Sequence, residues 1–215
     1  IYTGDMRMKG TRRSQTECFI QRASELHPWI LITEGTQVTR ENECVTSEEE
    51  CKNKCAKAVE AARDRLAVAD FSARNVERLN SFHEIAQRTG RKLVILAKDA
   101  YLLDCLHSTE RDIPLPSSSL LIYDTPKASE GHWEDWIFNH YQDFVVGASS
   151  ISAAQGEYIL AFSFFDIKYL NDIMPEQGLY LYSSSEPYTE EQKIDFIRLY
   201  NCLLYTSPSP RDRTR

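Results

Sequence analysis

The sequence predicts an α/β protein with a mostly parallel sheet flanked by helices, and two observations carry the prediction. Short apolar runs rich in β-branched residues recur along the chain, as is typical of strands buried on both faces. These runs are residues 29–35, 66–71, 92–97, 119–124, 143–148, 158–164 and 178–184. Amphipathic stretches of helical period separate most of them, at residues 47–65, 72–90, 98–107, 132–141 and 186–201. Alternating strands and helices indicate a parallel sheet with crossover connections.

The helical stretches begin and end at recognisable residues. Ser47 and Glu50 have the spacing of a capping box, in which each side chain bonds the backbone N–H of the other residue. We expect Ser72 to cap the second helix and Gly90 to end it, because glycine readily adopts the left-handed conformation that closes a helix. The remaining stretches follow the same amphipathic pattern.

The composition is that of a soluble globular chain. With 215 residues, of which 42% are hydrophobic and 27% charged, the chain can form one domain of ordinary size. No apolar run reaches the roughly 20 residues that span a bilayer, so we expect no membrane partner. The net charge of −7 argues against broad electrostatic capture of nucleic acid. It leaves room for a local basic groove, or for a site whose positive charge comes from metal ions.

The cysteines and histidines give no metal-binding pattern. Cys51 and Cys55 share a helix face, but together with Cys44 they match no zinc motif. We interpret the cysteines as reduced thiols of an intracellular protein and expect a cytoplasmic location. The histidines form no H-x-H pair, so we assign them to structural or surface positions: His27, His83, His107, His132 and His140.

The turn DFSARN follows a predicted strand, at the edge where ligands of parallel sheets gather. Its exposed N–H groups, together with Ser72, Arg74 and Asn75, can hold a phosphate group. An equally good interpretation is a plain helix cap at Ser72, with Arg74 in a surface ion pair. Lys98, at the end of the next strand, can join this group, but a lone lysine is more often solvated.

Two carboxylates stand out near the beginning of the chain. Asp5 follows Gly4 in the stretch YTGD, and Glu34 ends the apolar run at residues 29–35. Taken alone, the first is typical of an aspartate that caps a turn. The second is equally compatible with an acid that caps a neighbouring turn.

The ordered combination of these stretches resembles a known family. YTGD, a helix, a strand ending in glutamate, then DFSARN and YSSSEP are similar to the junction between a metallo-β-lactamase core and its β-CASP insertion. Nucleic-acid-processing metallohydrolases such as ribonuclease J and the mRNA 3′-end-processing endonuclease have this arrangement. The resemblance covers nearly all of residues 1–201. It implies that residues 1–35 end a metallo-β-lactamase core half and that residues 36–201 form a β-CASP domain.

The resemblance also implies roles for individual residues. Asp5 matches the aspartate that bridges two divalent metal ions, which are zinc in this interpretation. Glu34 matches the acid that orients a histidine for proton donation to the leaving oxygen. The serines of YSSSEP match a loop that contacts phosphate, although a solvated serine-rich turn is the alternative: Ser183, Ser184 and Ser185.

The function implied is that of a metal-dependent phosphodiesterase that processes RNA, with single-stranded DNA as the second choice of substrate. Loss of one metal ligand, as in Asp5→Asn, is expected to abolish nuclease activity of the complete enzyme. Two alternatives stay open: a non-catalytic β-CASP scaffold protein of a processing complex, and a hydrolase of the same core that acts on another ester. The resemblance is also compatible with a homodimer.

The two ends of the chain suggest a fragment. The family's H-x-H-x-D-H metal motif would precede YTGD, and further histidines would follow residue 201. Residues 202–215 instead read CLLYTSPSPRDRTR, and the first eleven are compatible with one reading frame of a sequencing adapter. We therefore expect a non-native tail at 202–215 and an internal fragment before it. Such a fragment lacks most metal ligands, so we expect it to bind no metal pair and to hydrolyse nothing.

Overall fold

The chain divides into two compact units, Ile1–Cys55 and Ala56–Arg215. The computed structural model describes residues 1–4, 6, 12–35, 48–72, 74–125, 132–184 and 189–205. The expected domain boundary at 35/36 stays a prediction, because residues 36–47 lie outside the described part, as does the proposed cap residue Ser47. No helix in the described ranges is both long and apolar enough to cross a bilayer.

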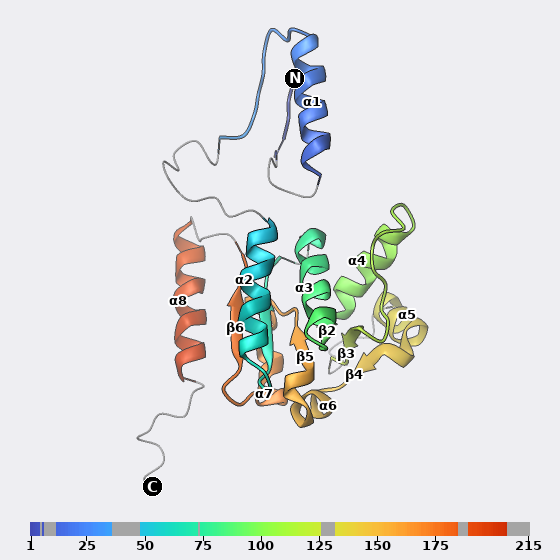
Figure 1. The fold of residues 1–215 in the computed structure, drawn as a ribbon, viewed down its shortest axis with the longest axis vertical. Helices are drawn as coiled ribbons and strands as arrows, with labels where there is room; N and C mark the ends of the chain where they lie inside the picture. The colour runs from blue at the N-terminus through green and yellow to red at the C-terminus, as the bar shows by residue number, and fades with distance from the viewer. Residues whose placement is uncertain are drawn as a thin grey trace. The chain divides into compact units, whose positions relative to one another are not determined.

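Parallel strands form the centre of the second unit (Figure 1). They are β1 (Ala67–Asp70), β2 (Lys92–Ile95), β3 (Leu120–Tyr123), β4 (Val145–Val146), β5 (Tyr158–Leu160) and β6 (Leu179–Tyr182). Their order in the sheet is β4-β3-β2-β5-β1-β6, and every neighbouring pair is parallel. The predicted α/β class with a parallel sheet is therefore confirmed, and each of these strands falls within a predicted apolar run.

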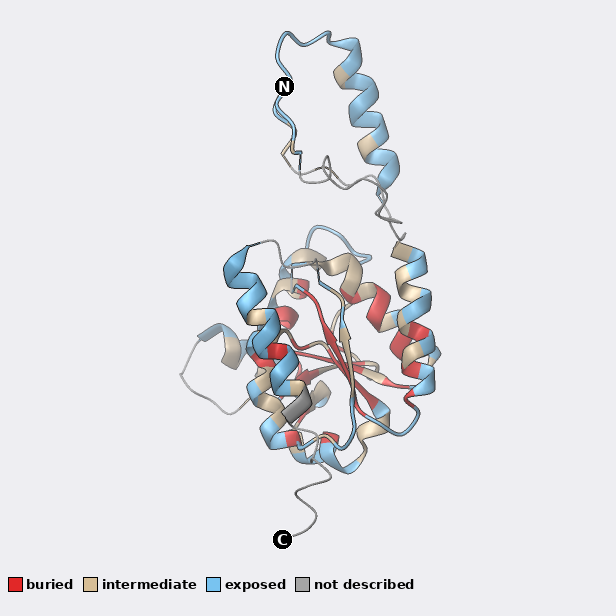
Figure 2. Ribbon diagram, turned by 90° about the vertical axis from the view of Figure 1, so that its left-hand side faces the viewer, coloured by how far each residue is buried: buried red, intermediate tan, exposed pale blue. Residues whose placement is uncertain are grey.

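Helices cover both faces of this sheet, so that the buried strands lie between two layers (Figure 2). The α-helices are α1 (Arg13–Glu25), α2 (Glu48–Ala61), α3 (Val76–Arg88), α4 (Ala97–His107), α5 (His132–His140), α6 (Ala148–Ala153), α7 (Leu170–Ile173) and α8 (Glu190–Tyr205). Short 3₁₀ helices are η1 (Gln142–Phe144), η2 (Gln155–Glu157) and η3 (Phe164–Tyr169). The predicted helices α2 to α5 and α8 are confirmed, with shifted ends.

The core follows from the alternation of side chains along each strand. Val68 of β1, Val94 of β2 and Leu160 of β5 point to the same face of the sheet and belong to one buried cluster. Ile151 of α6 and Ile173 of α7 complete this cluster from the helix layer. Both faces of these strands are buried, which explains why the runs in the sequence are nearly continuous rather than alternating.

The strand order places a topological switch between β2 and β5. After β2 the chain moves outward to β3, whereas after β5 it moves the other way, past β1, to β6. The carboxyl ends of β2 and β5 are neighbours, and their outgoing connections diverge. In open parallel sheets this divergence leaves room for a ligand, so the switch directs attention to the residues that follow β1, β2, β5 and β6.

Three predicted helix and strand boundaries are wrong. Helix α3 begins at Val76, and its cap is Asn75, whose side chain accepts a bond from the Arg78 N–H at 3.1 Å. Ser72 is not the cap. Its carbonyl oxygen instead accepts the Asn75 N–H in a turn, with 2.8 Å between the nitrogen and the oxygen. Helix α8 continues past residue 201 to Tyr205, since no glycine or proline interrupts that stretch.

The third error concerns residues 29–35, which do not form a buried strand. They form only an isolated parallel bridge, Tyr2 to Ile32, and Trp29 is fully exposed at 101%. Helix α1 of the same unit has no buried residue. A buried strand needs neighbours that cover both its faces, and an apolar run cannot reveal whether those neighbours exist.

Candidate functional site

The two segments predicted to carry the acidic site residues lie side by side in the first unit. The Thr3 N–H bonds the Ile32 carbonyl at 3.0 Å, and the Ile32 N–H bonds the Ile1 carbonyl at 2.9 Å. Glu34 is half-buried, and its Oε1 accepts the Met6 N–H at 3.0 Å. Asp5 itself lies outside the described residues. The bond from Met6 fits an acid that caps the neighbouring turn, so the catalytic role of Glu34 stays a prediction.

In the second unit, Asp70 ends β1 and is almost completely buried. The Tyr180 hydroxyl of β6 donates to Asp70 Oδ2 at 2.7 Å, and the Phe164 backbone N–H after β5 also bonds this carboxyl group. Burial raises the pKa of Asp70, and the nearby negative charge of Asp166 acts in the same direction. The buried carboxylate of Asp70 therefore links β1 to β6 and to the segment that follows β5.

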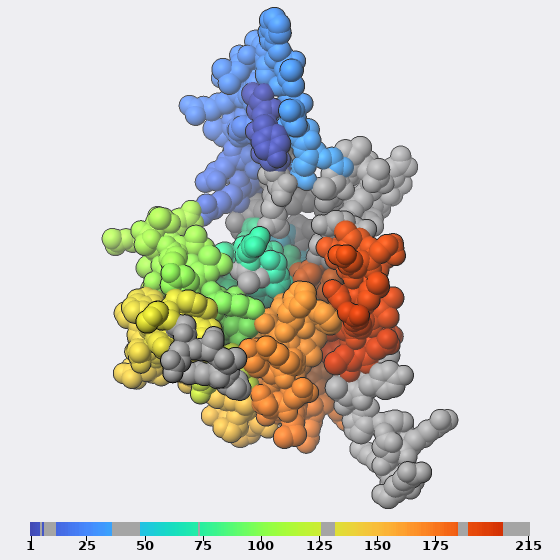
Figure 3. Space-filling view, turned by 180° about the vertical axis from the view of Figure 1, so that it is seen from behind, coloured from blue at the N-terminus to red at the C-terminus, as the bar shows by residue number. Residues whose placement is uncertain are grey.

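A cavity of about 500 Å³ opens beside Asp70 at this edge of the sheet. Its walls come from the residues after β1, after β5 and after β6, and from α8. Figure 3 shows α8, in red, standing beside the orange segments that follow β5. The lining residues are Asp70, Phe71, Ser72, Ser163, Phe164, Phe165, Tyr182, Ser184, Gln192, Asp195, Phe196 and Leu199.

The structure brings together two of the predicted phosphate-contacting turns. Ser72 and Ser184 are both exposed and both line this cavity, although they are far apart in the sequence. The Ser183 N–H donates to the Asp70 carbonyl at 2.8 Å. Arg78 of α3 donates to the Ser183 carbonyl at 3.2 Å and also bonds the Ser183 hydroxyl. Arg78 thus holds the turn after β6 against the turn after β1.

The other predicted residues of these turns are only partly accounted for. Arg74 is exposed, and it has no hydrogen bond or ion pair in the described ranges, so the alternative of a surface ion pair is wrong. Asn75 is half-buried and its side chain is used to cap α3, which removes its carbonyl oxygen from ligand binding. Ser185 lies outside the described residues.

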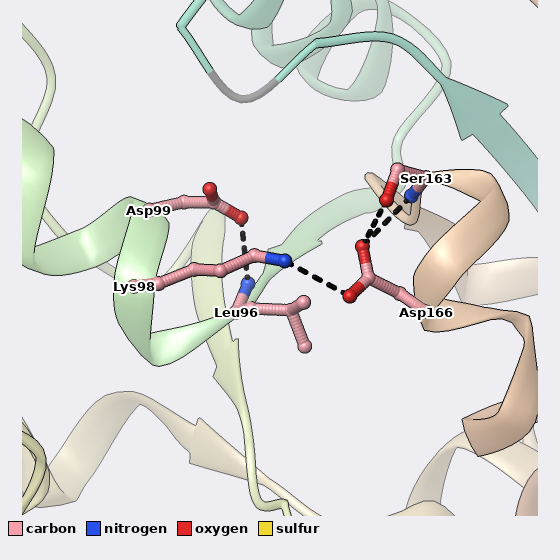
Figure 4. A network of polar contacts seen from close by, with 5 residues as sticks. All are labelled: Leu96, Lys98, Asp99, Ser163 and Asp166. Atoms are coloured by element: carbon pink, nitrogen blue, oxygen red, sulfur yellow. Dashed lines mark hydrogen bonds and ion pairs between the residues drawn. The ribbon is translucent and has the colours of Figure 1, made fainter.

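A second polar group occupies the switch between β2 and β5 (Figure 4). Lys98 of α4 reaches across to Asp166 of η3, with 2.9 Å between Nζ and Oδ1, so it is not the isolated solvated lysine that we expected. Asp166 also accepts the Ser163 N–H at 3.1 Å and bonds the Ser163 hydroxyl. This group fixes the start of η3, and with it the cavity wall formed by Phe164 and Phe165.

Asp99 is the least satisfied acid at this edge. Its Oδ2 accepts the Leu96 N–H at 3.2 Å and caps α4, but its buried Oδ1 has no partner within the described residues. Burial raises the pKa of Asp99 to about 6, while the Leu96 bond and the charge of Lys98 act against that rise. Asp99 therefore titrates closer to neutrality than an ordinary aspartate.

The described residues contain no cluster of three or more histidine, cysteine, aspartate or glutamate side chains able to hold a metal ion. His83, for example, bonds the Ser119 hydroxyl at 2.9 Å, and burial lowers its pKa. None of the described cysteines forms a disulfide. The structural or surface role of the histidines and the reduced state of the cysteines stay predictions.

Sequence reasoning missed the contributions of Arg78, Tyr180 and Asp166. Each acts across a long separation in the sequence, for instance 110 residues between Tyr180 and Asp70. A partial signal existed, because all three lie within three residues of a predicted strand or turn at the carboxyl edge. The cavity wall supplied by α8 had no signal at all, since the sequence does not say which face of that helix lines the cavity.

Comparison with known proteins supports the fold and leaves the function open. No protein-family model matches this chain, and no curated protein matches it. A crystal structure described as a protein of unknown function from Enterococcus faecalis V583 has a TM-score of 0.68 and 18% sequence identity to it. The match covers 95% of this chain but only 44% of that protein, so the chain spans less than half the length of its structural relative.

Proposed function

We propose that this chain is the strand-binding part of a metal-dependent phosphodiesterase that acts on RNA. The observation that carries the proposal is the meeting of two hydroxyl-bearing turns, around Ser72 and around Ser183 and Ser184, at one edge of a parallel sheet. That edge is where ligands of such sheets bind. The resemblance to β-CASP nucleases supplies the substrate class and the β-CASP assignment of this domain.

The local charge of these turns favours contact with a phosphate backbone. Arg74 is exposed and uncommitted in the described ranges, and Arg78 already bonds the Ser183 turn. Side-chain hydroxyls, backbone N–H groups and arginines are the usual partners of phosphate oxygens. The net charge of −7 limits affinity, because repulsion from the rest of the chain opposes these few contacts.

The metal pair implied by the resemblance does not fit the described residues, which hold no suitable ligand cluster. We therefore derive no catalytic step from this chain. Its proposed contribution is to bind the strand, while Asp5 and Glu34 would belong to a catalytic centre that needs further ligands.

Fluorescence anisotropy of a labelled single-stranded RNA with the purified 215-residue chain tests the proposal directly. We expect binding that weakens steeply as salt concentration rises, because released counterions drive phosphate contacts. Arg74→Ala is expected to weaken binding uniformly across sequences and to lower the salt slope by about one.

Arg63→Gln is the matched control. Arg63 is an exposed arginine between α2 and β1, at the amino end of the sheet, so its replacement should leave RNA affinity unchanged. Absence of RNA binding at low salt, or equal loss in both variants, would refute the strand-binding assignment. Elemental analysis of the same sample is expected to find no stoichiometric pair of zinc ions, and finding one would overturn our account of the metal site.

A further inference from the structure

The cavity beside Asp70 has a lining that does not suit a phosphate group. Among its described lining residues there is no lysine, arginine or histidine. Two carboxylates are present instead, those of Asp70 and Asp195, together with three serine hydroxyls. A phosphate inside this cavity would meet like charge, so the basic groups outside it and the cavity itself must recognise different parts of a ligand.

Aromatic rings form the apolar part of the lining. Phe165 is 75% exposed, so its ring is accessible to a ligand in the cavity that it lines. Tyr182 and Phe196 pack edge to face with 5.1 Å between ring centroids, and each is slightly more than a third exposed. Flat exposed rings around a cavity are the surfaces on which unstacked nucleobases stack.

The two carboxylates differ in what they can still accept. The Asp70 carboxylate already accepts bonds from the Tyr180 hydroxyl and from the Phe164 N–H. Asp195 of α8 has only a 3.3 Å contact from Oδ1 to Arg198 on the helix surface. Its Oδ2 has no partner in the described ranges, and its Oδ1 can accept a second bond beside that from Arg198, so both oxygens can face two N–H groups of a ligand.

We propose that this cavity holds one nucleobase of the bound strand and prefers guanine. Guanine presents adjacent N–H donors from its ring nitrogen and its amino group, which match one carboxylate in a two-pronged contact. Cytosine and adenine each offer a single amino group beside an acceptor, and uracil a single ring N–H. Stacking on Phe165 and Tyr182 binds any base, and Asp195 supplies the preference.

The inference rests on the proposed function and adds a base-reading site to it. Arg78 bonds Ser183, which directly precedes the lining residue Ser184. Arg74 follows the lining residue Ser72 by two positions. Both arginines therefore lie close to residues that line the cavity. A nucleotide with its base inside the cavity and its phosphate at these arginines would contact both the aromatic and acidic lining and the basic groups outside it.

Isothermal titration of the purified chain with GMP and with UMP tests this site, since the two ligands share one phosphate and differ in the base. We expect GMP to bind about tenfold more tightly than UMP. Asp195→Asn should reduce GMP affinity to the UMP level and leave UMP affinity unchanged. Phe165→Ala, a change at an exposed ring, should weaken both nucleotides.

Asp143→Asn is the control, because Asp143 is an exposed acid at the amino end of β4. If RNA binds but GMP and UMP bind equally or not at all, the base site is wrong and strand binding stands. If GMP is preferred and RNA does not bind, the base site stands and the proposed function falls. Binding of tetramethylammonium in place of GMP would make the cavity a cation site and overturn the inference.

Discussion

The two ends of the parallel sheet handle buried charge in opposite ways. At the amino end, Arg91 is buried and its guanidinium donates to the carbonyls of Arg65 at 2.8 Å and Val59 at 3.2 Å, and also bonds that of Arg63. At the carboxyl end, Asp70, Asp99 and Asp166 are buried, and Asp99 retains an unpartnered oxygen. The first arrangement is that of a structural clamp, and the second leaves capacity for ligands and protons.

Packing shows the same contrast. Gly156, just before β5, lies so close to the chain after α2 that an added Cβ would meet Asp64 Cα at 2.6 Å. The carboxyl end instead contains the 500 Å³ cavity. In a parallel sheet the residues that stabilise the fold can thus gather at one edge and those that bind ligands at the other. Three substitutions test this difference.

Replacement of Arg91 should have the largest effect. Arg91→Met keeps much of the side-chain length but removes the guanidinium that donates to three backbone carbonyls, so we expect a loss of about 3–5 kcal/mol in unfolding free energy. Urea denaturation measures it. Arg88→Met is the control, since Arg88 makes only an exposed 3.3 Å ion pair with Glu60, and it should cost less than about 1 kcal/mol. Equal losses in the two variants would contradict a stabilising role of Arg91 at the amino end of the sheet.

Asp99→Asn should come second and should depend on pH. The folded pKa of about 6 lies above the ordinary value of 3.8, so the folded state binds more protons between these values and loses stability as pH rises through them. Relative to Asp99→Asn, the wild-type chain should lose about 3 kcal/mol in stability from about pH 4 to about pH 7. Burial also raises the pKa of Asp70, but this effect is common to both proteins.

Urea denaturation across that pH range checks the prediction, with the exposed Asp112→Asn as control. A constant difference between wild type and Asp99→Asn would mean that Asp99 has an ordinary pKa and that the carboxyl end is no less satisfied than the amino end.

Tyr180→Phe should have the smallest effect of the three. It removes the hydroxyl that donates to Asp70 at 2.7 Å, and the acid keeps its bond from the Phe164 backbone. We expect a loss of about 1–2 kcal/mol, measured by urea denaturation. Tyr200→Phe, at an exposed position of α8, should be neutral. A neutral Tyr180→Phe would show that Asp70 does not depend on β6.

The sheet was predictable from the sequence, whereas the site was predictable only in part. Six apolar runs became strands because burial on both faces imposes a continuous apolar pattern. The run at residues 29–35 has the same apolar pattern and remains exposed. An apolar pattern shows that a segment can be buried, but it does not show whether other segments cover it. Ser72 and Ser184 were placed at the correct edge because turns after parallel strands share an edge.

The partners of those residues could not be predicted. The choice of Asn75 over Ser72 as helix cap depends on where the turn after β1 closes, and both residue types are good caps. The contacts Lys98–Asp166 and Arg78–Ser183 join segments separated by 68 and 105 residues, and no local pattern encodes them. Strand order decides these pairs, and the alternation of strands and helices does not reveal strand order.

The insertion of β5 between β2 and β1 has a consequence for how the chain acquires its structure. Within the described residues β1 pairs with β5 and β6, and both of these strands follow β4 in the sequence. A nascent chain that ends after β4 therefore contains β1 with no native neighbour, while β2, β3 and β4 can already pair. Such long-range closure slows folding and exposes an apolar strand edge during synthesis. We expect β1 to be the segment of this domain most dependent on chaperones until residue 160 has emerged from the ribosome.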